Sequence, residues 1–259
     1  MNYKLGENEL RETITFVYMI ASRDTEKENI VFLDIETVPQ KADFTEMAEP
    51  LQKLWEEKLT RQKLLKENET IAEAWGRAGL YAEFGKIICI GIGFFEKDRL
   101  QLRAFSGDNE KKILQDFSSF LGQFIEFRNR AIQLCAHNGK EFDYPYIARR
   151  MLLNKVRIPT ILDNGGKKPW EVPLLDTLEM WKFGDYKAYS SLNLLATIFG
   201  LPSPKQDIDG SKVGEVYWHH HDTDRITRYC CNDVATLANV YLCMKGREPF
   251  TEQDIVYKP

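Results

Sequence analysis

The chain has 259 residues, 43% of them hydrophobic and 29% charged, which is enough apolar content to bury a full core in one large domain. Its formal net charge of -4 argues against a protein that coats nucleic acid by bulk electrostatics, although it is compatible with a local basic surface. No apolar run approaches the length of a membrane span and the N-terminus lacks the basic-then-apolar order of a signal peptide, so we expect a cytoplasmic protein without a membrane partner.

The first part of the chain predicts an extension, a core strand and a helical insertion. Residues 1–29 form an N-terminal extension around the apolar run "ITFVYMI", which could be a helix or an added strand. The apolar run from Ile30 predicts a core strand that ends at Asp34. From about 41 to 82, apolar residues recur at helical spacing, so we predict two helices inserted after this strand.

The remainder of the chain alternates strand and helix patterns. Strands are predicted in "GKIICIGIGFF", "LQLRAF", "AIQLCAHN" and "VPLLDT", and helices in residues 109–127, in "EFDYPYIARRMLL" and in "ITRYCCNDVATLANVYL". This order predicts an α/β fold with a mixed β-sheet flanked by helices. We place the domain at residues 30–244, followed by a C-terminal tail at 245–259.

The five cysteines are predicted to be reduced core residues. They are an odd number, lie mostly inside apolar stretches and show no paired spacing suited to zinc. They are Cys89, Cys135, Cys230, Cys231 and Cys243.

The stretch "IVFLDIET" ends an apolar strand pattern with two acids, Asp34 and Glu36. Residues two apart on a strand point to the same face, so the two carboxylates would lie side by side and repel unless a cation, a proton or water compensates. A divalent metal would explain the pair. Alternatively the strand ends at Leu33 and both acids are solvated loop residues, because Asp-x-Glu occurs by chance about once in a chain of this length.

Two further acids occur in patterns that could bring them to the same site. Asp143 follows Asn138 at the start of a predicted helix, where it could equally be a favourable acid near a helix N-terminus. Tyr229 and Asp233 are four residues apart, and hence neighbours on one face of a long helix whose apolar stripe faces the core. A carboxylate beside that stripe is costly to bury unless it is paired or bound to a metal, the alternative being a half-exposed position at the edge of the face.

A local basic surface is predicted between residues 138 and 170. This segment contains seven basic and three acidic residues, a local excess of +4. The basic residues are Lys140, Arg149, Arg150, Lys155, Arg157, Lys167 and Lys168. Such clusters are often only solvated faces, so this one supports nucleic-acid binding without establishing it.

Three of these motifs, "DIET", "HNGKEFDYPYI" and "YCCND", resemble the exonuclease motifs of the DEDD superfamily of 3′-to-5′ exonucleases, which have a ribonuclease H-like fold. The resemblance covers roughly residues 30–244 and extends to the predicted exonucleases related to the proofreading domain of family B DNA polymerases. It implies a ribonuclease H-like mixed sheet with a helical insertion after the first core strand. It also implies the tyrosine branch, termed DEDDy.

The resemblance implies a site with two divalent ions, Mg²⁺ or Mn²⁺. Asp34, Glu36 and Asp233 would hold one ion, and Asp34 would bridge to a second ion held by Asp143. Tyr229 would orient the attacking water. Residues expected to contact the substrate are His137, Asn138 and Phe142, and Glu36 could also touch the 3′ hydroxyl.

The activity implied is removal of nucleoside monophosphates from a free 3′ end, with single-stranded DNA as the expected substrate. An RNA 3′-end trimming enzyme is an alternative, because no residue distinguishes deoxyribose from ribose. A non-catalytic nucleic-acid-binding relative is another, although such a protein has no use for clustered charge. The helical insertion could restrict entry to single strands or could only cover the sheet edge.

Two other pairs compete for the catalytic roles. His219 and Asp224 have the His-x4-Asp spacing of the histidine branch, but Asp224 precedes the periodic helix, where an N-cap belongs, and the histidines are expected in an exposed loop. Asp176 with Glu179 has the spacing of a capping box, so we favour a structural role for Asp176.

Overall fold

The computed structural model describes residues 29–185, 187–202 and 207–258, so the predicted N-terminal extension lies outside the described residues except for its last position. Six strands form one mixed sheet in the spatial order β5-β4-β1-β2-β3-β6. The strands are β1 (Ile30–Pro39), β2 (Gly85–Glu96), β3 (Arg99–Ser106), β4 (Gln133–Ala136), β5 (Leu175–Asp176) and β6 (Ile255–Tyr257). β1, β2 and β3 are antiparallel neighbours, and the remaining pairs are parallel.

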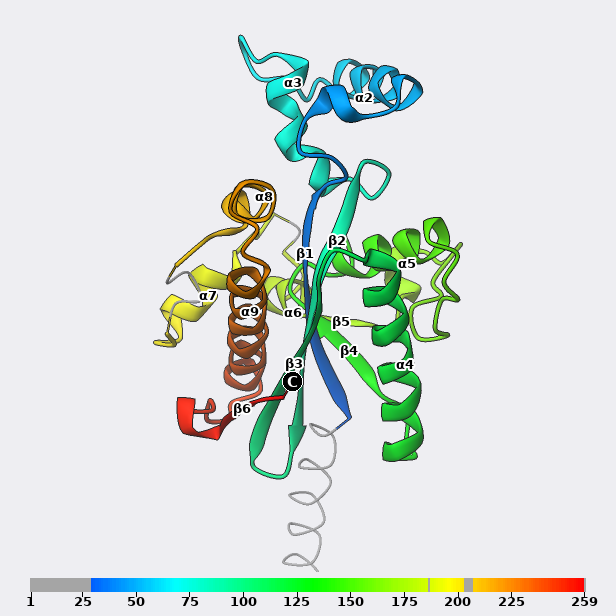
Figure 1. The fold of residues 1–259 in the computed structure, drawn as a ribbon. Helices are drawn as coiled ribbons and strands as arrows, with labels where there is room; N and C mark the ends of the chain where they lie inside the picture. Colours follow the sequence, from blue (N-terminus) through cyan, green and yellow to red (C-terminus); the bar gives the residue numbers. More distant parts are fainter. Residues whose placement is uncertain (1–28, 186, 203–206, 259) are drawn as a thin grey trace, which may run out of the picture.

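Helices cover both faces of this sheet (Figure 1). The α-helices are α2 (Glu49–Arg61), α3 (Ile71–Ala74), α4 (Glu110–Arg128), α5 (Asp143–Leu153), α6 (Thr177–Lys182), α7 (Leu192–Ile198), α8 (Val213–Glu215) and α9 (Thr223–Met244). Short 3-10 or π segments are η1 (Phe44–Glu46), η2 (Trp75–Leu80), η3 (Pro169–Glu171), η4 (Gly210–Lys212), η5 (Val216–His220) and η6 (Glu252–Asp254). α9 packs on one face, and α4 and α5 lie on the other.

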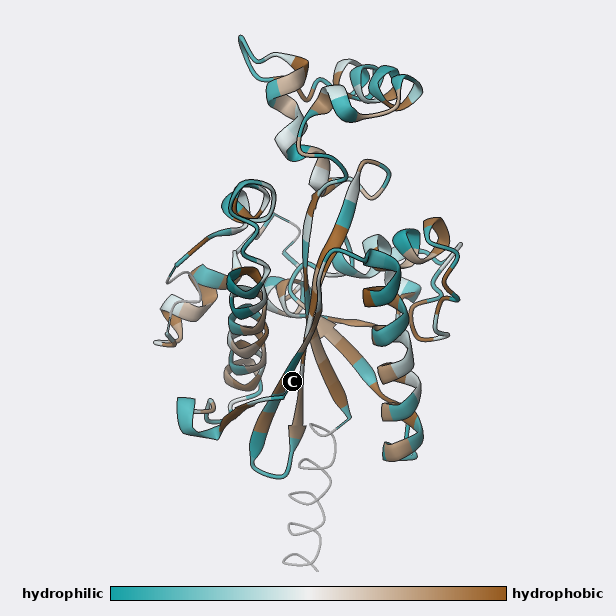
Figure 2. Ribbon diagram, in the orientation of Figure 1, coloured by the Kyte–Doolittle hydropathy of each residue, from teal (hydrophilic) through white to brown (hydrophobic). Residues whose placement is uncertain are grey.

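Alternation along β1 divides its apolar side chains between the two faces. Val31, Leu33 and Ile35 pack in the core beneath α4 and α5. Ile30 and Phe32 pack in the core beneath α9. Figure 2 shows hydrophobic residues concentrated along the central strands, with hydrophilic residues toward the outside of the helices. The predicted α/β class, with a mixed sheet flanked by helices and a helical insertion after the first core strand, is confirmed.

The predicted end of the first core strand and the predicted separate C-terminal tail are both wrong. β1 does not end at Asp34 but continues to Pro39, because β2 pairs with it along this whole length through an irregularity between Glu36 and Thr37. The tail after residue 244 is not separate from the sheet, because β6 pairs with β3 as a sixth strand.

The helical insertion occupies residues 40–84 and is called the insertion arm below. One long helix, α2, is present, but the second predicted helix is replaced by α3 and η2. Gly76 and Gly79 lie in this second segment and disfavour an extended α-helix. The arm has a small aromatic core of its own, in which Trp55 packs against Trp75 and Phe84.

The arm is anchored to the sheet beside the end of β1. The hydroxyls of Thr37 and Tyr146 both donate to the carbonyl oxygen of Gly79, each at 2.8 Å. A Cβ at Gly79 would lie 3.0 Å from the carbonyl carbon of Val38, so a glycine is needed for this close approach. The end of η2 is therefore fixed close to Glu36.

One residue of the predicted basic surface, Arg150, is buried in the core. Arg150 is 6% exposed and donates to both carboxylate oxygens of Glu110, at 2.8 and 2.5 Å, and to the carbonyl oxygen of Ala82 at 2.8 Å. Lys140 is also paired, with Glu179 at 2.7 Å. Both residues act within the fold, and Arg150 is not part of the surface.

All five cysteines are free, and Cys243 alone is not fully buried. This agrees with the prediction of reduced core residues for Cys89, Cys135, Cys230 and Cys231, whereas Cys243 is only partly buried. Across the described parts of the chain, no helix combines the length and apolarity that crossing a bilayer requires.

Candidate active site

The first two acids lie on β1 and face α9. Asp34 and Glu36 point to the same side of the strand as Phe32, which packs beneath α9. One carboxylate oxygen of each acid and the Sγ of Cys230 all lie within 4.8 Å of one another. Glu36 is only 7% exposed. Because the strand continues through both acids, the alternative of two solvated loop residues is wrong.

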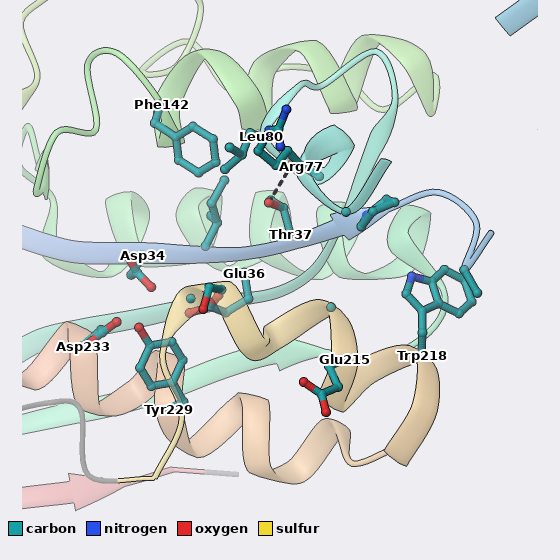
Figure 3. Close-up of a pocket in the computed structure, with 18 of the residues that line it drawn as sticks. Asp34, Glu36, Thr37, Arg77, Leu80, Phe142, Glu215, Trp218, Tyr229 and Asp233 are labelled. Atoms are coloured by element: carbon teal, nitrogen blue, oxygen red, sulfur yellow. Dashed lines mark hydrogen bonds between the residues drawn. The ribbon is translucent and has the colours of Figure 1, made fainter. Parts of the chain in front are cut away.

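α9 brings the next two residues to this pair. The helix is capped by Asp222, whose carboxylate accepts from the backbone N–H of Arg225 at 3.0 Å. Further along, Tyr229 and Asp233 lie one helical turn apart, and the hydroxyl of Tyr229 lies close to the carboxylate of Asp233 (Figure 3). Figure 3 shows both side chains directed toward β1, on the side of the strand where Asp34 lies.

The fourth acid, Asp143, is the first residue of α5 and is 4% exposed. Its carboxylate lies near its own backbone N–H and near that of Ile35, and both partly offset the rise in its pKa that burial causes. Pairing between β1 and β4 ends at Phe32 and Cys135, so the Ile35 N–H is available to a side chain at this edge. The carboxylate of Asp143 thus occupies the position next to β1 that a longer β4 would take.

The charges of these acids are strongly coupled. Burial first, and then the charge of Glu36, Asp233 and Asp143, raises the pKa of Asp34 well above its usual range. Burial and the neighbouring acids also raise the pKa of Glu36, and burial raises the pKa of Asp143 to about 7. Burial, with Asp233 next, raises the pKa of Tyr229. Burial and mutual repulsion leave these acids without a compensating positive charge. A hard divalent cation with oxygen ligands would supply that charge, so the donor set fits Mg²⁺ or Mn²⁺.

A cleft of about 1030 Å³ opens over the acids. Asp34, Glu36, Tyr229 and Asp233 line it, but the buried Asp143 does not. Its other lining residues come from the end of β1, the insertion arm, the start of α5 and the segment from η4 to η5. They are Ile35, Thr37, Pro39, Ala42, Gly76, Arg77, Gly79, Leu80, Phe142, Gly210, Ser211, Gly214, Glu215, Trp218 and His219.

Several of these lining residues were not found from the sequence. Arg77, Leu80 and Trp218 lie far from the three motifs in the chain and have no spacing that marks them. Cys230 was assigned only to the core, although its thiol also lies 3.6 Å from the Oδ2 of Asp34. Its place directly after Tyr229 in "YCCND" was the available signal.

Of the three residues predicted to contact the substrate, one lines the cleft and two do not. Phe142 lines the cleft, whereas His137 and Asn138 are not among its lining residues. His137 instead joins two other segments, with its Nδ1 2.9 Å from the Oγ1 of Thr177 and its Nε2 2.8 Å from the carbonyl oxygen of Ser190. Because a carbonyl only accepts, Nε2 carries the proton of the neutral ring.

The competing residues occupy other positions. Asp224 was expected to be the N-cap of α9, but Asp222 fills that position. Asp224 lies in the first turn of the helix. It is nine residues before Asp233, about 13 Å along the helix axis. His219 lies in η5 rather than in a loop; it is exposed, as predicted, but it lines the cleft.

Asp176 has the structural role predicted for it. Its carboxylate caps α6 through the N–H of Leu178 at 2.9 Å and also accepts from the N–H groups of Asn138 and Lys140 at 2.9 and 3.0 Å. Glu179 does not close a capping box but pairs with Lys140.

No curated protein matches the chain. Among solved structures, the chain is similar to the family B DNA polymerase from the hyperthermophilic archaeon Pyrobaculum calidifontis, with 13% sequence identity and a TM-score of 0.47. That similarity covers 85% of this chain but 26% of the polymerase, so the chain spans about a quarter of that protein.

A family model matches residues 80–255, which is more than half of the chain. The matched region includes Asp143, Tyr229 and Asp233 and begins after Asp34 and Glu36. The family is described as a predicted 3′-5′ exonuclease related to the exonuclease domain of PolB. The chain belongs to this family of predicted 3′-5′ exonucleases.

Proposed function

We propose that the protein is a divalent-metal-dependent 3′-to-5′ exonuclease that releases nucleoside monophosphates from single-stranded nucleic acid, with DNA as the preferred polymer. The observation that carries the proposal is the meeting of four acids from three elements at one cleft. β1 supplies Asp34 and Glu36, α5 supplies Asp143, and α9 supplies Asp233. Their mutual repulsion destabilises the metal-free fold, which is the expected cost of a binding site rather than of a structural cluster.

The four carboxylates would hold two ions, Mg²⁺ or Mn²⁺, with Asp34 shared between them. Bound there, such ions would polarise the scissile phosphate and lower the pKa of the attacking water. Glu36, the more buried of the two β1 acids, would contact the terminal 3′ hydroxyl. Phe142, on the opposite side of the cleft, offers a flat apolar surface to a base.

Tyr229 would orient the attacking water. Its pKa is raised further above the usual value of about 10, so its hydroxyl remains protonated at neutral pH and is unsuited to act as a base. The hydroxyl instead lies beside the carboxylate of Asp233 (Figure 3). Its contribution is therefore to position an oxygen nucleophile relative to the acids.

The cleft offers few positive side chains to the phosphates of a bound nucleic-acid strand. Among the described lining residues, Arg77 is the single lysine or arginine, and its guanidinium donates to Glu69 and to the carbonyl oxygen of Leu64. Glu215 on the other wall pairs with Lys212 at 3.1 Å. Phosphates in the cleft would thus depend chiefly on the divalent ions.

The direct test uses single-stranded DNA and RNA labelled at the 5′ end, with Mg²⁺, Mn²⁺ or a chelator. The proposal predicts a ladder that shortens from the 3′ end on DNA, requires a divalent ion and disappears with the chelator. The same ladder on RNA alone would identify the RNA-trimming alternative. Binding of both polymers without cleavage would identify the non-catalytic alternative.

A further inference from the structure

Three glycines on the cleft walls occupy positions that the fold itself does not require to be glycine. A Cβ at Gly76, Gly210 or Gly214 would meet nothing within 4 Å, and none of the three has a positive φ. By contrast, Gly79 packs tightly against β1. A glycine within a helix is less stable than an alanine because its unfolded backbone has more freedom to lose, so these residues cost stability without improving packing.

All three glycines line the cleft, and they lie on opposite walls of it. Gly76 belongs to η2 of the insertion arm, while Gly210 and Gly214 belong to the segment that begins with η4. Figure 3 shows the neighbouring Arg77 and Glu215 on opposite sides of β1. The missing side chains leave the backbone of both walls open to close approach by a ligand.

The arm also contributes an apolar surface to the cleft, on the side of β1 opposite the acids (Figure 3). Leu80, the last residue of η2, is 57% exposed and lines the cleft. Figure 3 shows it next to Phe142, on the same wall as Arg77. Leu80 and the ring of Phe142 together offer an apolar surface to the face of an unpaired base. Every base has such a face, so this contact would tolerate any sequence.

The position of this wall is fixed by the fold. Gly79 is held to β1 and α5 by the hydroxyls of Thr37 and Tyr146. The side chain of Trp75, at the start of η2, also donates to the carbonyl oxygen of Lys41 at 2.9 Å. The arm is therefore a preorganised wall rather than a lid that must order on binding.

We propose that a single strand of nucleic acid passes between the insertion arm and the segment from η4 to α8, with its sugar-phosphate backbone against Gly76, Gly210 and Gly214. Leu80 and Phe142 contact the bases of this strand. That the ligand of this channel is nucleic acid rests on the proposed function. It assigns the insertion arm to substrate selection and not merely to cover for the sheet edge.

The test fills the channel without touching the acids. Gly76 and Gly214 are each replaced by Ala and by Leu, and Gly122→Leu serves as the matched control. Gly122 lies within α4, also has nothing within 4 Å of its Cβ position, and is not a lining residue of the cleft. Binding of a fluorescent single-stranded oligonucleotide with a cleavage-resistant 3′ phosphorothioate end is measured together with the thermal midpoint.

The channel predicts that Kd rises with side-chain size, by at least about tenfold in Gly76→Leu and Gly214→Leu, while the thermal midpoint stays equal or increases. Gly122→Leu should bind as the wild type does. Wild-type Kd in both folded leucine variants would overturn the proposal. A wild-type protein that binds but never cleaves would instead refute the proposed activity, because the binding comparison does not depend on cleavage.

The role of Leu80 has its own matched control in Leu54. Leu54 is a similarly exposed leucine of the arm, at 52%, but lies on α2 outside the cleft lining. Leu80→Ala should weaken oligonucleotide binding several-fold, and 2-aminopurine at the 3′ end should lose the fluorescence change that stacking produces. Equal behaviour of Leu80→Ala and Leu54→Ala would remove Leu80 from the channel.

Discussion

Gly91 lies directly across from Asp34 in the antiparallel register of β1 and β2. A Cβ at Gly91 would lie 2.8 Å from the Sγ of Cys230 on α9. The absence of that side chain allows α9 to approach the sheet closely at this point. Tyr229 and Asp233, which flank Cys230 on the helix, are thereby brought to the acids of β1.

Replacing Gly91 with Ala should push α9 away from Asp34. Overpacking of this kind costs about 1–3 kcal/mol in the free energy of unfolding, and turnover should fall further than stability alone explains. Gly93→Ala is the control, because its Cβ would also lie 2.8 Å from an α9 side chain, Val234, but farther from the acids. Urea unfolding and turnover are measured for both. Equal losses of turnover would contradict the proposed geometry.

Removing the Tyr229 hydroxyl should affect catalysis and leave binding intact. Tyr229→Phe should lose about 10²- to 10³-fold in turnover, as when one positioned hydrogen-bonding group is removed from an active site. The residual activity should retain the pH dependence of the wild type, since the hydroxyl is not the group that titrates. Turnover against pH is the measurement.

The histidine alternative is tested in parallel. His219→Ala should reduce turnover much less than Tyr229→Phe does. An active Tyr229→Phe beside an inactive His219→Ala would make His219 the general base. The third-motif acid would then be Asp224 instead of Asp233.

His137 should make stability depend on pH. Burial lowers the pKa of His137, so the folded ring stays neutral at a pH where the unfolded ring, with a pKa of about 6.5, takes up a proton. Its stabilising contribution is therefore fully present above about pH 6.5 and declines as the pH falls below that value.

The measurement is the free energy of unfolding of wild type and His137→Gln at about pH 8 and about pH 5.5. The difference between the two proteins should be smaller at the lower pH. The exposed His219, replaced by Gln, controls for the loss of a histidine that is not buried. A difference that stays constant or grows at low pH would mean that His137 is not held neutral.

The buried pair of Arg150 and Glu110 should be essential to the fold. Arg150→Met leaves the Glu110 carboxylate buried without its cation, which typically costs about 3–5 kcal/mol. The neighbouring Arg149 is exposed, so Arg149→Met should change stability by no more than about 0.5 kcal/mol. Chemical denaturation of both variants decides, and similar stabilities would show that the pair is dispensable.

The sequence predicted the features that depend on local pattern. Alternation around Asp34, helical spacing around Asp233 and the stop of β4 before Asn138 were sufficient to predict the strand and the two helices that carry the four acids. The burial of Arg150 was missed, because its partner Glu110 lies 40 residues away and charge counting treats both as surface residues. The strand β6 was missed because three residues form no recognisable period and its pairing with β3 is long-range.

The walls of the cleft required the three-dimensional structure. Leu80 and Gly76 precede β2 in the chain, and the return of η2 to the end of β1 depends on single hydrogen bonds to Gly79. Gly214 resembles any surface glycine in the sequence. Only the open space at its Cβ position and its place on the cleft give it significance.

The central claim is that Asp34 serves metal binding at the expense of stability, and the thermal midpoint of Asp34→Asn with and without Mn²⁺ tests it most directly. Without metal, the variant should melt at a higher temperature than the wild type, because an acid whose pKa is raised in the folded state destabilises that state at neutral pH. Added Mn²⁺ should raise the midpoint of the wild type and leave that of Asp34→Asn nearly unchanged. Two results would contradict this claim and make Asp34 a structural residue. One is that Asp34→Asn melts below the wild type without metal, and the other is that Mn²⁺ raises the midpoint of Asp34→Asn as much as that of the wild type.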